Sequence, residues 1–244
     1  MKADWQRIQR WAGVPDDGDP GPVTARGIIA KAQISDDGGS PLLDRAEFLA
    51  RYVNRTAPAI DDDDRVAAAR KLGVTLKHIR MIEKVESAGR SFDDVGRPVI
   101  LPEPHVFHRL TEGRFGVTAF SYPKWGTMPY PSTYDARWKV LADMAERDEA
   151  AALQSASWGL FQVMGFHWKV CGYESPYAFA AGMAGNEDDH LEAMVGFVDA
   201  ENLEDDLLAC RADDPESCRP FARGYNGAGY AKNNYHIKMA AALR

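Results

Sequence analysis

The chain has 244 residues, of which 45% are hydrophobic and 27% charged, the proportions of an ordinary soluble globular protein with a core of normal size. Its formal net charge of -7 excludes the basic excess that drives binding to a phosphate backbone, so we expect no nucleic-acid partner. No stretch approaches the ~20 apolar residues that span a bilayer, so we expect no membrane insertion.

The N-terminal segment predicts a small helical unit. A short amphipathic helix around Trp5 ends at Gly13, and a loop rich in Asp, Gly and Pro follows. Thr24 can then cap a second helix. A third helix is expected from Leu42 to Val53.

An acidic run, Asp61 to Asp64, follows these helices. We interpret it as a solvated linker or a helix N-terminus rather than a metal site. It divides the chain into a three-helix module with its linker, residues 1–62, and a second domain, residues 63–244. The first residues lack the apolar core of a signal peptide, so we expect synthesis in the cytoplasm.

The second domain is predicted to be mainly α-helical, interrupted by one aromatic stretch rich in Pro and Gly. Within that stretch, residues 92–110 could form short strands or a hairpin, which their prolines restrict to edges or loops. Helices are expected near residues 65–72, 76–86, 133–153, 187–200, 203–210 and 230–243.

The three cysteines, Cys171, Cys210 and Cys218, lack paired CxxC spacing, so no zinc site is expected. Cys210 and Cys218 flank a polar turn. They could form a disulfide in an oxidising compartment, or stay reduced at the ends of two neighbouring helices. No metal or organic cofactor is implied.

The helix 76–86 carries a carboxylate where an apolar side chain is expected. At 100° per residue, Ile79 and Ile82 lie on an apolar arc, and Glu86 falls near its centre. Burial penalises the charged form and raises the pKa of a carboxyl group, as a general acid requires. The alternative is a glutamate at a fraying helix end. Glu83 leans toward the same face and is expected to be a structural carboxylate, paired or capping.

Three segments stand in an informative order: Glu86-Ser87, Gly159-Leu160-Phe161-Gln162-Val163-Met164, and Tyr225-Asn226-Gly227. They resemble the three signature segments of the lysozyme-like superfamily. With their surroundings, they resemble the N-acetylmuramidase family of modular phage endolysins over roughly residues 65–244. The resemblance implies a lysozyme-like α-helical catalytic domain with a short β-hairpin or loop region.

The resemblance also implies roles for single residues. Glu86 would protonate the glycosidic oxygen between N-acetylmuramic acid and N-acetylglucosamine in bacterial peptidoglycan. Gln162, Tyr225 and Asn226 would line the sugar-binding cleft, where amides and phenols can donate and accept hydrogen bonds without charge. The alternative is that Gly159 and Tyr225 only shape turns of the core.

Two further segments resemble parts of such endolysins. Leu101 to Phe107 resembles a family Leu-Phe-Glu-x-His-x-Phe segment, which implies substrate-binding roles for Glu103 and His105. Pro102 replaces the family's aromatic residue, so the role of Glu103 stays open. In residues 1–62, Asp17 to Thr24 resembles the loop of peptidoglycan-binding modules, although a simple helix–loop–helix turn would use the same residues.

Glycoside hydrolysis normally uses two carboxylates. The candidates for the second are Asp93, Asp94, Glu103 and Glu83, and members of this superfamily can also work with the single glutamate. The expected activity is hydrolysis by a monomer that reaches the cell wall after membrane permeabilisation. A lytic transglycosylase that yields 1,6-anhydro ends, or a non-catalytic wall-binding or virion structural protein, would show much the same sequence.

Overall fold

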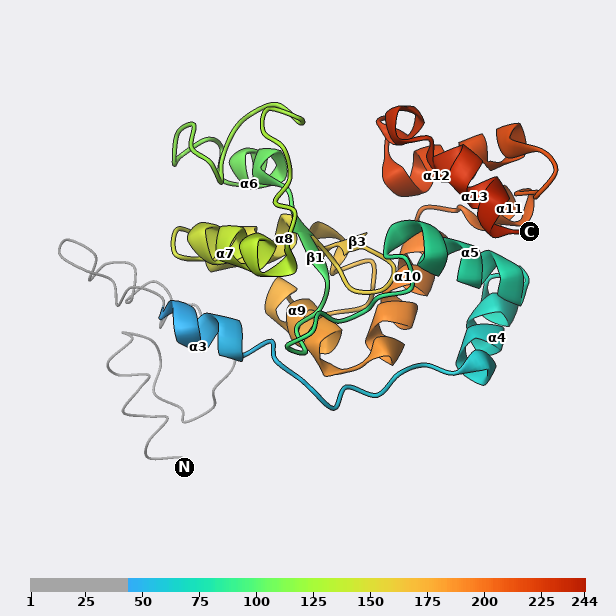
Figure 1. Cartoon of the computed structure of the whole chain (residues 1–244), viewed down its shortest axis with the longest axis horizontal. Helices are drawn as coiled ribbons and strands as arrows, with labels where there is room; N and C mark the ends of the chain where they lie inside the picture. Colours follow the sequence, from blue (N-terminus) through green and yellow to red (C-terminus); the bar gives the residue numbers. More distant parts are fainter. Residues whose placement is uncertain (1–43) are drawn as a thin grey trace, which may run out of the picture. The chain divides into compact units, whose positions relative to one another are not determined.

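The computed structural model of the protein describes residues 44–244, which are mainly α-helical with a small antiparallel sheet, as the sequence predicts (Figure 1). The chain separates into two compact units, Met1–Asp44 and Arg45–Arg244. The predicted first and second helices and the loop between them lie outside the described residues. Within the described part, no helix is long and apolar enough to cross a membrane.

The larger unit begins at Arg45, earlier than the predicted boundary at residue 62. Phe48 and Tyr52 are buried, and the Tyr52 ring lies 5.4 Å from the ring of Trp138. The Asn54 N–H also donates to the Gly96 carbonyl at 2.8 Å. Residues 45–61 therefore belong to the larger unit, because their apolar side chains complete its core.

The elements follow one another in this order: α3 Arg45–Ala50, α4 Asp62–Lys71, α5 Leu76–Glu86, β1 Ile100–Pro102, α6 Pro104–Leu110, α7 Tyr134–Ala145, α8 Glu149–Gln154, β2 Ala156–Trp158, β3 Val163–Met164, α9 Pro176–Gly185, α10 Glu187–Ala200, α11 Glu204–Leu208, α12 Arg219–Asn226 and α13 Tyr235–Ala242. Short 3-10 turns cover η1 Gly165–His167, η2 Pro215–Cys218 and η3 Tyr230–Asn233.

The sheet has the order β1-β2-β3, with both pairings antiparallel. β1 is an edge strand, and Pro102 at its end lies opposite Ala156 of β2. This confirms that the prolines restrict the region to an edge. Phe92 and Pro98 form an isolated antiparallel bridge, as a short hairpin would. The last part of the predicted region is the helix α6 instead, because Pro104 occupies its first turn, where its missing N–H costs nothing.

Aromatic side chains fill the centre of the unit around the sheet. Trp138 of α7 and Trp158 of β2 are buried, with ring centroids 5.8 Å apart. Their indole N–H groups donate to the carbonyls of Pro98 and Leu153 at 3.1 and 3.0 Å. Because each buried N–H has a partner, the two tryptophans join α7 and β2 without leaving a polar group unsatisfied.

Helix periodicity located several elements well. α5 and α10 run from the predicted first residue to the predicted last one, and α4 starts in the acidic run as a helix N-terminus. The predicted helix 133–153 is two helices, because the Asp148 side chain caps a new start by accepting from Ala151 N–H at 2.9 Å. α9 and α12 were not predicted, since their sequences are rich in Gly and Pro.

Candidate active site

Helix α5 delivers Glu86 to a defined position because both of its ends are fixed. At the start, the Thr75 N–H donates to His78 Nδ1 at 3.2 Å. At the end, the Ser87 hydroxyl donates back to the Glu83 carbonyl at 3.2 Å. Ala88 then takes a left-handed conformation with φ of 55°, which the helix cannot continue through. Glu86 is therefore the last residue of the helix rather than part of a fraying end.

The Glu86 residue as a whole is partly exposed, but its carboxyl group is enclosed by protein. Asn226 Nδ2 donates to Glu86 Oε1 at 2.7 Å. Burial raises the pKa of Glu86 from 4.5 to about 7, and the Asn226 bond and the Lys238 charge oppose this rise only in part. The predicted shift of the pKa is present, and its cause is loss of hydration.

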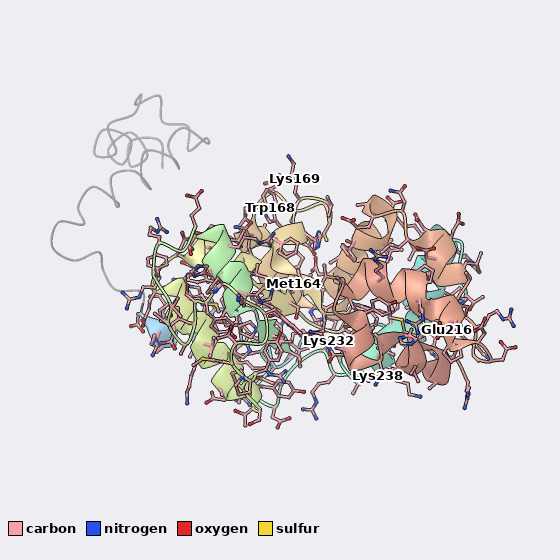
Figure 2. The ribbon with its side chains drawn as sticks, turned by 90° about the horizontal axis from the view of Figure 1, so that it is seen from above. Met164, Trp168, Lys169, Glu216, Lys232 and Lys238 are labelled. Carbon is pink, nitrogen blue, oxygen red and sulfur yellow. The ribbon has the colours of Figure 1, made fainter. Side chains whose placement is uncertain are left out.

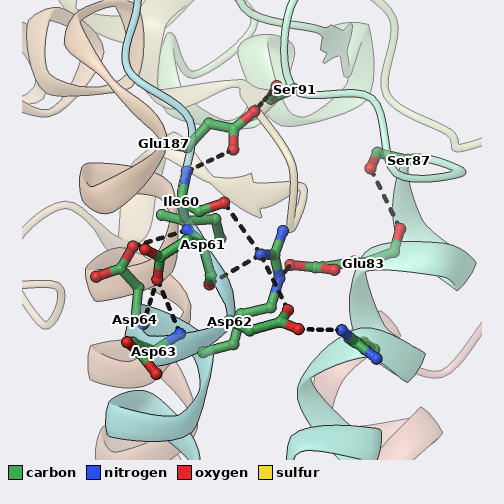
Figure 3. A network of polar contacts seen from close by, with 11 residues as sticks. Ile60, Asp61, Asp62, Asp63, Asp64, Glu83, Ser87, Ser91 and Glu187 are labelled. Atoms are coloured by element: carbon green, nitrogen blue, oxygen red, sulfur yellow. Dashed lines mark hydrogen bonds and ion pairs between the residues drawn. The ribbon is translucent and has the colours of Figure 1, made fainter.

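Glu83 lies one turn earlier on α5 and has a different environment (Figure 3). Arg65 Nε donates to Glu83 Oε1 at 2.7 Å. Arg65 Nη1 also donates to the carbonyl of Ile60. Burial raises the pKa of Glu83, and Arg65 opposes that rise. Glu83 is thus the paired structural carboxylate that the helical wheel predicts.

Asn226 reaches Glu86 from the last residue of α12. The helix ends there because Gly227 takes a φ of 73°, which glycine adopts at no steric cost. Asn226 Nδ2 is engaged with Glu86, whereas Asn226 Oδ1 is buried and has no hydrogen-bond partner among the described residues. Such an atom is costly unless a ligand or water satisfies it.

The turn between β2 and β3 holds the second signature segment. Gly159 has a φ of 67°, and a Cβ built there would lie 2.5 Å from the His190 ring. His190 Nδ1 accepts the Leu160 N–H at 3.1 Å. Glycine is therefore required at this position both for backbone conformation and for space.

The Gln162 side chain is occupied within the same turn. Its Nε2 donates to the carbonyls of Val99 and Gly159 at 3.1 and 2.8 Å, and its Oε1 accepts from Ser157 Oγ at 2.9 Å. The amide thus ties the turn to β2 and to the residue that precedes β1. Both of its N–H groups are occupied, whereas Oε1 has a second lone pair that a sugar hydroxyl can use.

Tyr225 connects the turn to α12. Its hydroxyl donates to the Phe161 carbonyl at 2.8 Å, and its ring packs against Phe197 and Phe221. The next residue, Asn226, holds Glu86. The three signature segments are therefore linked physically, from the turn through Tyr225 and Asn226 to Glu86.

Comparison with known proteins agrees with this geometry. The sequence profile of the N-acetylmuramidase family matches residues 75–244. The chain belongs to the N-acetylmuramidase family. This chain is similar to the crystal structure of the Burkholderia AP3 phage endolysin, with 31% sequence identity and a TM-score of 0.64. The match covers 99% of this chain and 93% of the endolysin chain. No curated protein matches the chain.

The other candidate carboxylates of this member of the N-acetylmuramidase family have protein partners. Asp93 pairs with Arg97 at 2.9 Å, and both side chains are nearly buried. Asp94 is 92% exposed and pairs with Arg90 at 2.8 Å. Both aspartates are therefore occupied by arginines. Glu103, the remaining candidate, stands at the start of α6.

Glu103 and His105 lie together at the start of α6, with His105 Nδ1 at 3.1 Å from Glu103 Oε2. The Tyr130 hydroxyl lies 2.8 Å from each Glu103 oxygen. The structure thus brings both predicted residues into one cluster, which also contains Tyr130, a residue that sequence reasoning missed.

Two more residues near Glu86 were missed, and both come from α13. The charges of Glu86 and Glu103 add to burial in raising the pKa of Tyr235 to about 12, so Tyr235 lies near both acids. Lys238 lies with its Nζ 5.3 Å from the Tyr235 ring centroid. Seen from above, Lys238, Lys232 and Met164 lie near the junction of the α6 and α12–α13 parts (Figure 2). Nothing in the sequence of this helix marks it as part of a site.

Residues 44–244 contain no group of His, Cys, Asp and Glu side chains suited to a metal ion. The thiols of Cys210 and Cys218 are free and buried, and the Cys210 thiol donates to the Asp206 carbonyl at 3.5 Å. The reduced arrangement is therefore the one present.

Proposed function

We propose that this chain is a phage-type endolysin that hydrolyses the β-1,4 bond between N-acetylmuramic acid and N-acetylglucosamine in bacterial peptidoglycan. Glu86 is the general acid. The observation that carries the proposal is the enclosed Glu86 carboxyl group at the end of α5, whose contact in the protein is the neutral Asn226 amide at 2.7 Å. Its burial raises the pKa to about 7 and so keeps much of it protonated near neutral pH. Membership of the N-acetylmuramidase family supports the substrate, and the similar AP3 phage endolysin supports the biological role.

In the first step, Glu86 donates its proton to the glycosidic oxygen, so that the leaving sugar departs as a neutral alcohol. The carboxylate that remains is stabilised by the Asn226 N–H at 2.7 Å and by the Lys238 charge. Asn226 Oδ1, which has no partner among the described residues, can accept a hydrogen bond from the attacking water or a sugar group. The water oxygen then bonds to the anomeric carbon that the leaving sugar has vacated, and Glu86 takes the proton that the water loses.

Gln162 and Tyr225 act on this reaction through the fold. Their side chains bond within the protein, and they hold α12 in the place where Asn226 meets Glu86. The proposed substrate places the action of the enzyme at the bacterial cell wall. Wall binding is assigned to the smaller N-terminal unit, Met1–Asp44.

The test is the loss of turbidity of purified sacculi, comparing the wild type with Glu86→Gln. Removal of the acid is expected to lower the rate by about 100-fold or more. Glu174→Gln, which removes an exposed carboxylate, is the matched control and should cleave normally. Mass spectrometry of the products separates reducing muramic acid ends from 1,6-anhydro ends. Anhydro ends would make the protein a transglycosylase, and no turnover in the wild type would leave only a wall-binding role.

A further inference from the structure

A chain of hydrogen bonds holds an exposed tryptophan in the loop between α6 and α7. Trp125 Nε1–H donates to the Tyr130 hydroxyl at 2.8 Å, and that hydroxyl is shared between both Glu103 oxygens at 2.8 Å each. Trp125 is nevertheless 43% exposed and Tyr130 36%. A surface indole contributes little to the core, so the fold itself does not require this arrangement.

The carboxylate at the end of this series of hydrogen bonds is held in place by the backbone. Glu103 is the residue that precedes α6, and its N–H donates to the Ser155 carbonyl at 2.8 Å, next to β2. His105 Nδ1 also contacts Glu103 Oε2. The orientation of the Trp125 ring is thus fixed through two side chains back to the sheet, which removes much of the entropy that a loop residue would lose on binding.

The Trp125 ring lies close to the elements that surround Glu86. Lys232 of η3 places its ammonium group 5.2 Å from the ring centroid. η3 leads directly into α13, and α13 packs against α5, the helix that ends at Glu86. The tryptophan therefore lies against the segment that precedes the helix packed on α5.

We propose that Trp125 is a sugar-binding platform for the glycan strand and that Glu103 is a positioning residue for it, acting through Tyr130. The apolar C–H face of a pyranose packs on an indole ring, and a pre-oriented ring binds with a smaller entropy cost. The oxygens of Glu103 are occupied by Tyr130 and His105, so Glu103 is not the second catalytic carboxylate. The assignment rests on the proposed function for its substrate, a glycan of acetamido sugars.

The experiment measures binding in a Glu86→Gln background, so that it needs no turnover. Soluble glycan strands, freed from stem peptides by an amidase, are titrated into the full-length chain while tryptophan fluorescence and calorimetry are recorded. Trp125→Ala is expected to weaken binding about tenfold, and Tyr130→Phe and Glu103→Gln about threefold each. Tyr130 and Glu103 act through the same series of hydrogen bonds. The double variant Tyr130→Phe with Glu103→Gln should therefore weaken binding no more than either single variant. Val117→Ala, at a 73% exposed site of the same loop, should bind normally.

A second measurement, in the active enzyme, separates positioning from catalysis. Glu103→Gln should raise KM and leave kcat and its pH profile unchanged. A fall in kcat of about 100-fold with unchanged binding would make Glu103 a catalytic carboxylate and overturn the assignment. Unchanged binding by Trp125→Ala would overturn the platform itself. The binding result does not depend on Glu86, whose role is decided separately by the turbidity assay.

Discussion

Helix α5 carries two enclosed carboxylates one turn apart, and their surroundings differ. Glu83 faces α4 and pairs with the Arg65 guanidinium at 2.7 Å. Glu86 faces α12 and accepts one hydrogen bond from a neutral amide, also at 2.7 Å. Burial raises both pKa values, but only Glu83 has a charged partner in contact. The same residue type on one helix face thus gains a cationic partner or only a neutral amide, according to what the next helix supplies.

The largest expected effect concerns catalysis. Glu86→Gln should lower the cleavage rate by about 100- to 10000-fold, because the glycosidic oxygen loses its proton donor. Glu83→Gln should retain most of the activity, since Arg65 still donates to the carbonyls of Ile60 and Asp61. Initial rates on sacculi measure both. Equal losses in the two variants would remove the distinction between the carboxylates.

The next prediction concerns pH and stability. The pKa of Glu86 is about 7 in the folded chain and 4.5 ordinarily, so the folded state holds a proton that the unfolded state has lost between these values. Stability contributed by protonated Glu86 is therefore present below pH 4.5 and is lost as pH rises through 7, by about 3 kcal/mol. Glu86→Gln avoids this loss.

Thermal unfolding from pH 4.5 to 8 measures the effect. The Tm of Glu86→Gln relative to wild type should increase as pH rises and level off above pH 7. A difference that is constant with pH would show that Glu86 is fully hydrated in the folded protein.

A smaller loss of stability is expected at Glu83, the other enclosed carboxylate of α5. Arg65→Met leaves the Glu83 carboxylate enclosed without its cation and should destabilise the fold by about 2 kcal/mol. The figure is below that of a fully buried pair, because the side chains are 17% and 11% exposed. Chemical denaturation measures it. Adding Glu83→Met to Arg65→Met should recover part of the loss, whereas a further loss would mean that the pair is not the cause.

The smallest effect is a shift in the pH profile of cleavage. The Asn226 hydrogen bond and the Lys238 charge both lower the pKa of Glu86. Asn226→Ala should therefore move the alkaline limb of kcat/KM to higher pH, and Lys238→Gln should do so to a lesser extent. Lys77→Gln, on the exposed side of α5, is the control and should leave the limb in place. A shift to lower pH in either test variant would contradict the assignment.

The sequence could locate elements wherever a single local pattern dominates. The 3.6-residue period fixed both ends of α5 and placed Glu86 on its apolar face, and the same period located α10. The 3.6-residue period did not locate helices whose formation depends on packing against other segments. α9 and α12 contain Gly and Pro, and they are helical because their apolar residues, such as Phe179 and Phe221, are buried by neighbours.

For the site, the sequence by itself predicted Glu86 as the acid and located the two accompanying signature segments and the family they resemble. Only the tertiary structure decided what each of these residues contacts. It gave Asn226 the bond to Glu86, engaged Gln162 and Tyr225 within the protein, and brought Tyr130 and Tyr235 to the site from segments without a motif. The physical reason is that helix periodicity is a local property, whereas desolvation and hydrogen bonding depend on groups far apart in the chain.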